Sequence, residues 1–456
     1  MTDTRDPATA NTADASDFGP PPAPPDRAWV VTLRSNWMLP LAIAALIPLQ
    51  MLLTDRDYVD RYTLRIIMLI GINVILAVSL QLINGISGQF SLGHAGFMAV
   101  GAYLAGFPAR QYSAEFSDPA AVLGYYLALL VATAAGAAVF WGVSFAVRKT
   151  ARLHPALPLA TLGAFVVWLL ADLAIAARHT APLPPYLLWS HAAELPPLLF
   201  DRLRDFLIPA GTSVSSVLPG FLRFPLCFLI LLAGGGLCAA VAGLVVGLPT
   251  LRLRGDYLAI ATLGFAEIIR IVIINSKPAG GALGLLDVPT ATTFTWLYGT
   301  VIVTTVVIWR VAHSSTGRAF KAVREDEVAA AATGIDTTQY KVLAFVIGAF
   351  FAGVAGALAI HFEGSVYPNS FGFMRSVELV VIVVVAGRGS ITGTVLAAAV
   401  LTWLPEQLRG FQEWRLVIYA AVLIALMLLR PDGILGTREL WPRRRRRVAG
   451  ATAAAA

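Results

Sequence analysis

The residues of this chain whose types and spacing could do chemistry are concentrated in one charged stretch, 314–340, between two apolar runs. Three cations recur there at every third position, Arg318, Lys321 and Arg324, and an acidic run from Glu325 to Glu327 follows directly. Residues three apart share a helix face, so the stretch presents cations along one stripe and carboxylates beside it. Such a charge pattern is typical of a docking element for a partner protein.

Local signals define where a helix in this stretch would begin and end. Ser314 or Ser315 can cap its N-terminus, and 317–333 carries a run of helix-forming residues. Gly334 suits the left-handed position after a helix, and Asp336 begins a capping-box pattern for the next one. We therefore predict a short helix that turns sharply into an apolar span. The alternative is a solvated loop that carries the positive charge of one membrane side.

A second set of polar side chains interrupts an apolar region at 84–103, which also holds five glycines. The polar residues include Ser87, Gln89, Ser91 and His94. Irregular backbone at membrane depth is tolerated only where it is buried in protein or lines a cavity, and transporters build their pathways from broken helices. Close packing through the small residues is the alternative, and both interpretations stay open.

Ionisable residues also flank or interrupt the apolar run at 248–275, namely Asp256, Glu267 and Arg270. Glu267 and Arg270 are three apart, so they could pair on one helix face. Ionisable groups inside a membrane are functional candidates, although a structural ion pair near the surface is the alternative. We take Gln89, Ser91, His94 and Glu267 as candidate pathway-lining residues.

The elements that must position these residues are membrane helices. The chain has 456 residues, of which 57% are hydrophobic and 13% charged, whereas soluble domains carry about 25% charged residues. Apolar runs long enough to cross ~30 Å of hydrocarbon recur along it, and they are too long and continuous for barrel strands. We predict an all-α polytopic integral membrane protein with about 10–12 transmembrane or re-entrant helices, some of them discontinuous. The expected segments are 38–54, 62–84, 90–108, 121–147, 157–177, 221–247, 256–275, 297–312, 341–361, 376–387, 390–405 and 415–430.

Charge distribution predicts the orientation of these helices. Basic clusters at 148–152, 252–254, 318–324 and 443–447 all fall on the cytoplasmic side when the N-terminus starts there. Placing all four clusters on one side requires an even number of membrane crossings. We therefore expect 376–405 to form a hairpin or re-entrant pair that is broken at 387–390. Because the cations serve topology, the net charge of +7 does not indicate nucleic-acid binding.

Composition divides the chain into three parts. Residues 1–36 are rich in Ala, Pro, Asp and Thr and predict a disordered cytoplasmic extension. Residues 37–436 form the membrane domain, with 314–340 as its cytoplasmic coupling helix. Residues 437–456 form a basic, Ala-rich cytoplasmic tail.

Enzymatic chemistry has no support in the sequence. There is no G-x-x-x-x-G-K-[ST] phosphate loop, no His/Cys/carboxylate cluster with metal spacing, and no nucleophile beside a base. We therefore expect no catalytic residue, no metal ion and no cofactor, and any ATP hydrolysis would occur in a separate subunit.

Four motifs in order resemble the branched-chain amino-acid ABC transporter permeases, specifically their LivM-like branch. They are SGQFSLGHAGFMAVGAY, LRLRGDYLAIATLGFAEIIR, GRAFKAVREDEVAAAATGID and RPDGILG, and the likeness runs from about Gly71 to Gly436, weakening across 110–220. The resemblance implies a bacterial inner-membrane permease subunit of an ATP-driven importer for branched-chain or related amino acids. It also implies two ABC ATPase subunits, a LivH-like second permease, an extracytoplasmic solute-binding protein and membrane lipid as partners.

The resemblance further implies that the coupling helix contacts the ATPase through Arg318, Lys321, Arg324, Glu325, Glu327 and Gly334. One departure concerns Glu327, which precedes Gly334 by seven residues, whereas the broader importer motif places its glycine closer to the Glu-Ala-Ala. Relatives of similar sequence carry urea, amides or aromatic acids, so the substrate stays open. A rival from another class is a secondary transporter driven by an ion gradient, with Asp256, Glu267 or Glu378 as the coupling carboxylate.

Overall fold

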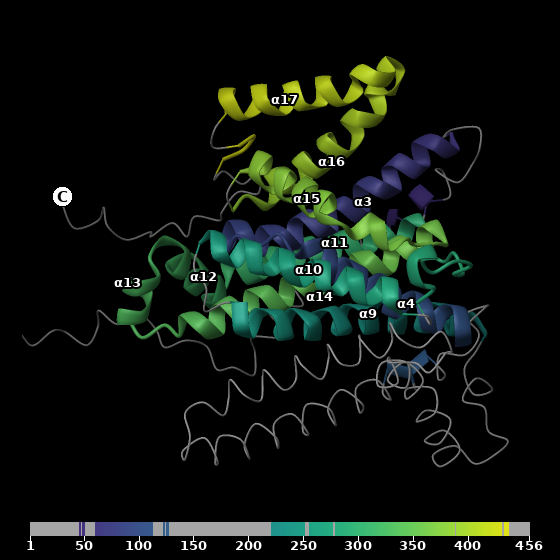
Figure 1. The fold of residues 1–456 in the computed structure, drawn as a ribbon, viewed down its shortest axis with the longest axis horizontal. Helices are drawn as coiled ribbons and strands as arrows, with labels where there is room; N and C mark the ends of the chain where they lie inside the picture. The colour runs from purple at the N-terminus through teal and green to yellow at the C-terminus, as the bar shows by residue number, and fades with distance from the viewer. Residues whose placement is uncertain are drawn as a thin grey trace, which may run out of the picture.

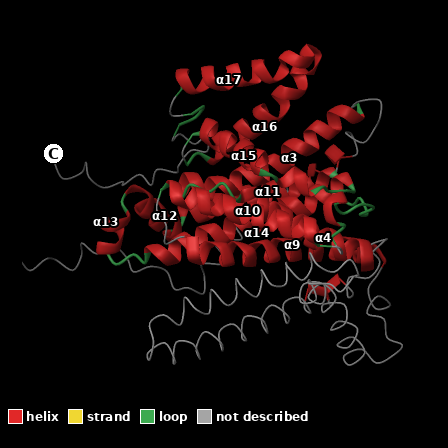
Figure 2. Ribbon diagram, viewed as in Figure 1, coloured by secondary structure: helices red, strands yellow, loops and turns green. Residues whose placement is uncertain are grey.

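A computed structural model describes residues 45–46, 48–50, 60–112, 122–123, 125–126, 220–250, 255–276, 279–387, 389–430 and 433–436. Within these ranges the chain forms helices and loops without a strand (Figure 2). The extension 1–36, the tail 437–456 and nearly all of the expected segments at 38–54, 121–147 and 157–177 lie outside the described residues. The longer α-helices are α3 (Arg61–Gln81), α4 (His94–Tyr112), α9 (Gly220–Thr250), α10 (Asp256–Asn275), α11 (Phe294–His313), α14 (Thr337–Glu363), α15 (Phe373–Ala386), α16 (Ile391–Gln407) and α17 (Arg415–Leu429).

Six helices of the described part are long and apolar enough to cross a membrane, and they confirm an all-α polytopic membrane protein. They span 61–86, 222–248, 256–275, 294–313, 337–363 and 368–386. Shorter elements connect the helices: a π-helix η3 (Leu82–Ile86), the 3-10 helices η4 (Gly281–Leu283), η5 (Pro368–Phe371) and η6 (Leu408–Trp414), and the short helices α12 (Ser315–Glu325) and α13 (Glu327–Ala332).

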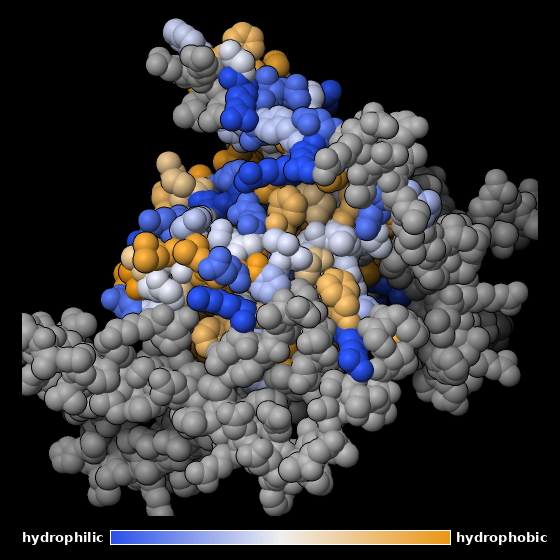
Figure 3. All heavy atoms as spheres, turned by 90° about the vertical axis from the view of Figure 1, so that its right-hand side faces the viewer, coloured by the Kyte–Doolittle hydropathy of each residue, from blue (hydrophilic) through white to orange (hydrophobic). Residues whose placement is uncertain are grey.

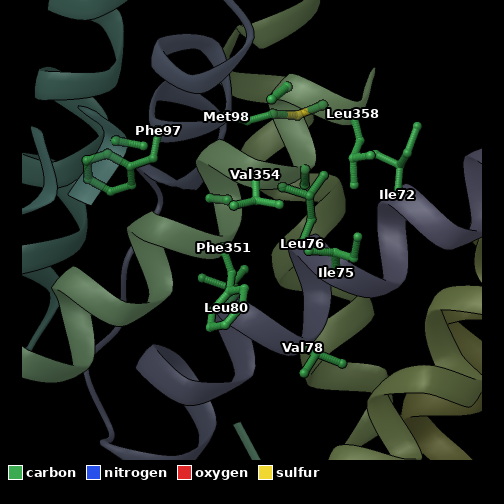
Figure 4. Close-up of a cluster of buried hydrophobic side chains, with 14 of the residues drawn as sticks. Ile72, Ile75, Leu76, Val78, Leu80, Phe97, Met98, Phe351, Val354 and Leu358 are labelled. Carbon is green, nitrogen blue, oxygen red and sulfur yellow. The ribbon is translucent and has the colours of Figure 1, made fainter. Parts of the chain in front are cut away.

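The core lies where α14 packs against α3, α4 and α9. Figure 4 shows side chains from three of these helices meeting there, including Leu76 of α3, Met98 of α4 and Val354 and Leu358 of α14. A helix that is apolar on all sides is stable when it is buried on all sides, and α14 satisfies this condition over most of its length. Its position brings the elements on either side of it into one bundle (Figure 1).

Glycines allow α4, α9 and α14 to approach at backbone distance. A Cβ atom on Gly235 of α9 would lie 2.9 Å from the carbonyl oxygen of Gly101 in α4, and one on Gly353 of α14 would lie 2.8 Å from that of Gly235. Gly93 and Gly96 likewise face α10, with Cβ positions 2.6 Å from the carbonyl oxygen of Thr262 and 2.9 Å from the Cα atom of Ala266. Small residues of this kind let the backbones of membrane helices approach closely and gain van der Waals contact.

The loops gather at two ends of the bundle. At one end, which we call the connector end, lie α12 and α13 with the turns at 82–91, 386–390 and 433–436. At the opposite end Leu285 forms an isolated antiparallel bridge with Val366. Figure 3 faces this opposite end, where many of the described surface side chains are hydrophilic.

The expected break within 376–405 is confirmed. Helices α15 and α16 pack against each other and turn at Gly387 and Gly389, whose φ angles of 99° and 87° suit glycine. Asn73 of α3 contacts both arms, since its Nδ2 donates to Thr402 Oγ1 at 2.9 Å and its Oδ1 accepts from Arg375 at 2.5 Å. The two helices therefore form a hairpin against α3. Helix α17 stands apart and contacts mainly η6 (Figure 1).

Candidate functional site

The charged connector forms two short helices, where a single helix over 317–333 was expected. Asp326 lies between them with extended backbone angles (φ −154°, ψ 114°), and its carboxylate accepts from the amides of Val328 and Ala329 at 2.8 and 3.1 Å. An aspartate satisfies backbone donors at a helix start better than it tolerates a helix interior. The acidic run therefore ends α12 and begins α13.

The other predicted ends of the connector are confirmed. Ser314 caps α12 by accepting from the amide of Gly317 at 3.3 Å, and Asp336 caps α14 by accepting from the amide of Gln339 at 3.1 Å. Gly334 adopts the left-handed conformation with φ 85°. These caps fix the direction in which the chain leaves the connector and enters α14.

Two sets of contacts fasten the connector to the bundle. Phe320 is fully buried and meets Tyr340 edge-on, with ring centroids 6.0 Å apart. Glu327 of α13 pairs with Lys341 of α14 at 2.7 Å between Oε1 and Nζ, and their side chains are 27% and 11% exposed. Lys341 was absent from the residues that the sequence selected, although an ionisable residue at the start of an apolar span is a signal that a partner is nearby.

The three cations of the predicted stripe have different surroundings. Arg318 is exposed and donates to Ser315 Oγ at 2.9 Å, and Lys321 is half-buried. Arg324 turns toward the bundle, where its Nη1 donates to the carbonyl oxygen of Gly85 at 2.9 Å. Glu325 is exposed and accepts from Nε and Nη2 of Arg324, a bond that lowers the pKa of its carboxyl.

The polar segment at 82–94 is irregular, as expected, and several of its polar groups bond to one another or to neighbouring helices. The π-helix η3 continues α3, and 87–93 has no regular structure before α4 begins. Asn84 Oδ1 accepts from the amide of Ser91 at 3.2 Å, and Gln89 Nε2 donates to Ser87 Oγ at 2.8 Å and to the carbonyl oxygen of Lys341 at 3.2 Å. π-Helical turns of this kind are rare and are frequently found at functional sites.

Gln89, Ser91 and His94 are all buried, with 3%, 0% and 0% of each residue exposed. Ser91 Oγ accepts from the amide of Gly93 at 3.3 Å. His94 Nε2 lies 2.8 Å from Ser79 Oγ, whose hydroxyl also donates to the carbonyl oxygen of Leu76. Two buried acceptor or donor atoms, Gln89 Oε1 and His94 Nδ1, have no hydrogen-bond partner within the described part of the chain. The structure thus brings three of the four pathway candidates together at the start of α4.

Glu267 lies apart from those three on α10. It pairs with Arg270 at 2.7 Å, as the spacing predicted, and Arg270 also donates to Asn369 Oδ1 at 3.1 Å. Glu378 forms a matching pair with Arg375 at 2.7 Å on α15. In both cases an arginine one helical turn away compensates the carboxylate.

A cavity of about 310 Å³ lies at the opposite end, between α3 and the end of α16. It is lined by Tyr62, Arg65, Ile66, Leu69, Glu406 and Arg409. Tyr62 donates to Glu406, and Arg409 lies 5.5 Å from the centre of the Tyr62 ring. None of the sequence-selected residues lines this cavity. Across the described ranges, no group of three His, Cys, Asp or Glu side chains is placed to hold a metal ion.

Comparison with known proteins gives a consistent match. The pattern of the family described as branched-chain amino acid transport system / permease component matches residues 62–180 and 156–429. The chain is 37% identical over 235 residues to the high-affinity branched-chain amino acid transport system permease protein LivM of Escherichia coli (strain K12), covering 44% of this chain and 55% of that protein. It is 37% identical over 131 residues to the corresponding LivH protein of the same strain, covering 28% of this chain and 42% of LivH. The chain thus spans about half the length of the curated relatives it matches, and no solved structure matches it significantly.

Proposed function

The chain belongs to the family of branched-chain amino acid transport system permease components, and we propose that it is the membrane subunit of an ATP-driven importer. In this proposal two ABC ATPase subunits bind at the connector end, and a LivH-like second permease completes the membrane unit. An extracytoplasmic solute-binding protein delivers a branched-chain or related amino acid, the class that the names of the LivM and LivH relatives state for those proteins. The connector end then faces the cytoplasm of a bacterial cell, together with both termini.

The main support for this proposal is the structure of the connector. Helix α13 protrudes at the connector end (Figure 1) and exposes Val328 to 67%, with Ala329, Ala331 and Ala332 exposed beside it. The other side of the connector is fastened by Phe320 and by the ion pair of Glu327. An element with an apolar outer face and a rigid inner attachment can both bind a partner and move the bundle.

Arg318, Lys321, Glu325 and Gly334 are the proposed ATPase-coupling residues of the outer face, with Glu327 and Arg324 fastening it from inside. Arg318, Glu325 and Gly334 are exposed in the chain alone. Rim charges of this kind mainly steer the encounter between partners and set their register. The apolar face of α13 would supply the apolar surface that is buried against the ATPase.

We also propose that Gln89, Ser91, His94 and Glu267 line the pathway. The unused hydrogen-bonding atoms of Gln89 and His94 support this role, because a buried polar atom without a partner is costly and a functional role is one reason for keeping it. Access to them requires α4 and α10 to separate, since Gly93 and Gly96 pack directly against α10.

Cross-linking tests the docking surface. In a variant without its native Cys227 and Cys238, Val328→Cys is expected to cross-link to the ATPase subunit with a short bifunctional reagent. Leu283→Cys is the matched control, because Leu283 is 76% exposed but lies at the opposite end. Equal cross-linking at both positions, or none at Val328, contradicts the assignment.

Uptake measurements test the energy source against the ion-gradient alternative. Proteoliposomes that hold the full complex should accumulate amino acid when ATP is supplied to the ATPase side, and should continue after proton and sodium gradients are collapsed. Loss of uptake on collapse of the gradients, with uptake retained by an ATPase-inactive complex, overturns the proposed function.

A further inference from the structure

Arg324 brings three segments that are distant in sequence into contact at the connector end. It is carried by α12, and its Nη1 donates to the carbonyl oxygen of Gly85 in the π-helix at 2.9 Å. Its side chain also fills the space beside Gly88, and the same Nη1 lies next to Gly389 in the α15–α16 turn. The connector therefore touches both irregular turns of the bundle through this side chain.

Glycines shape the space that Arg324 occupies. Gly88 and Gly389 have φ angles of 75° and 87°, a conformation that side chains disfavour. A Cβ atom on Gly88 would lie 2.5 Å from Cγ of Arg324, and one on Gly389 would lie 3.3 Å from Nη1. Because both turns are in van der Waals contact with the Arg324 side chain, a displacement of α12 displaces them as well.

The end of α3, which leads into the first turn, is also bonded to the second turn. Gln81 Nε2 donates to the carbonyl oxygens of Gly387 and Ser390 at 2.8 and 3.5 Å. The amide of Ile434 donates to the carbonyl oxygen of Val385 at 2.9 Å, so the segment 433–436 belongs to the same junction. Three of the four family-like motifs found in the sequence, which contribute Gly88, Arg324 and Ile434, thus meet at this junction with the α15–α16 turn.

The guanidinium of Arg324 is directed inward and held there. Glu325 Oε1 accepts from Nε at 3.0 Å and also from Nη2, while Nη1 is engaged by Gly85. The side chain is 27% exposed. Arg318, six residues earlier in the same predicted stripe, has an exposed side chain. The two arginines therefore face different environments although their spacing is regular.

We propose that Arg324 is a positioning residue that transmits movement of the connector to the turns at 85–89 and 387–390, acting from inside this chain. The inference rests on the proposed function, because it takes ATPase-driven movement of the connector as given. It replaces the expectation that Arg324 contacts the ATPase. The charge-assisted hydrogen bond to Gly85 and the packing against Gly88 and Gly389 suit this task, and the two bonds to Glu325 fix the direction of the guanidinium.

The test separates docking from transmission in the full reconstituted complex. Two quantities are measured for each variant: the affinity of the ATPase subunits for the membrane unit, and the number of amino acids imported per ATP hydrolysed. Arg324→Gln should keep affinity within about twofold and lower the import-per-ATP ratio about tenfold, the loss expected when a charged hydrogen bond is removed from the moving state. Arg324→Lys, which keeps the charge but not the planar fork, should retain part of the ratio.

Two further variants make the result decisive. Gly389→Ala changes no residue of the connector but places a methyl group against Nη1 of Arg324, so it should lower the ratio while affinity stays at the wild-type value. Arg318→Gln should instead weaken affinity with the ratio unchanged. If Arg324→Gln does not reach the membrane, the result for Gly389→Ala alone tests the inference.

The inference is overturned if Arg324→Gln or Gly389→Ala weakens affinity about tenfold at an unchanged ratio, or if both quantities stay at wild-type values in both variants. A wild-type complex that shows no ATPase binding overturns the proposed function, and it does so without any substitution.

Discussion

The ion pair between Glu327 and Lys341 gives a quantitative test of how the connector is fastened. The Oε1–Nζ distance is 2.7 Å, and the side chains are 27% and 11% exposed. Helix α13 carries the carboxylate and α14 carries the ammonium. Local opening of α13 must therefore break this pair, and its strength sets part of the cost of opening.

The expected magnitude follows from the distance and the burial. At an effective dielectric constant near 20, two unit charges at this separation attract by roughly 6 kcal/mol before desolvation is counted. Desolvation of two largely buried groups offsets most of this attraction, which leaves a coupling of about 2 kcal/mol. Lys341→Met should cost about 2 kcal/mol because the more exposed Glu327 regains water, and Glu327→Ala about 3 kcal/mol because Lys341 stays buried. The double variant should cost about 3 kcal/mol rather than the sum.

Hydrogen exchange of the amides at 330–333 measures the opening of α13 directly. A loss of about 2 kcal/mol lowers their protection about thirtyfold. Gln339→Ala is the matched control, since Gln339 is exposed and lies two residues before Lys341 in the same helix. Strictly additive losses in the double variant, or protection in Lys341→Met within twofold of wild type, would refute the reasoning.

Three substitutions test other features of the same architecture. Asp326→Ala should remove the cap of α13 at a cost of about 1 kcal/mol and raise exchange in that helix about fivefold, whereas Asp326→Asn should stay within about twofold; equal protection in both would contradict the capping assignment. Gly334→Ala should cost only the ~1 kcal/mol of left-handed strain, because nothing lies within 4 Å of the added methyl; a thermal unfolding shift worth more than about 3 kcal/mol would show a contact instead. Gly101→Ala places a methyl group into the backbone of Gly353 and should cost 3 kcal/mol or more or prevent folding, on the order of the largest core changes. Gly264→Ala, a helical glycine with nothing within 4 Å, should be neutral or stabilise by up to ~1 kcal/mol in the same detergent unfolding assay, and similar losses in the two glycine variants would be a contradiction.

Local sequence signals predicted the ends of elements well. Ser314, Gly334 and Asp336 act at their own helix termini, so their roles depend on neighbours within a few residues. The hairpin break at Gly387 and Gly389 follows from the same local logic, supported by charge parity. The split at Asp326 was missed because the run of helix formers around it outweighed the one residue that prefers a cap.

Partners that are distant in sequence were not predictable in this way. Arg324 and Gly85 are 239 residues apart, and nothing in the three-residue cation spacing distinguishes an arginine that faces inward from one that faces out. The Glu327–Lys341 pair was missed for the same reason, since the contact depends on the angle between α13 and α14. The irregular segment at 82–94 was found from its composition, and its role in a pathway stays a prediction.

The glycine contact among α4, α9 and α14 has a mechanical consequence. Because these helices meet through backbone atoms at Gly101, Gly235 and Gly353, no side chain can swing aside to open a passage between them, and separating them would create an empty seam inside a close-packed solid. The trio therefore behaves as a stiff spine. In the proposed transport function we therefore expect movement in α10, which packs on α4, and in the α15–α16 hairpin, which packs mainly on α3, so that the solute would pass along the flank of this subunit and not through its middle.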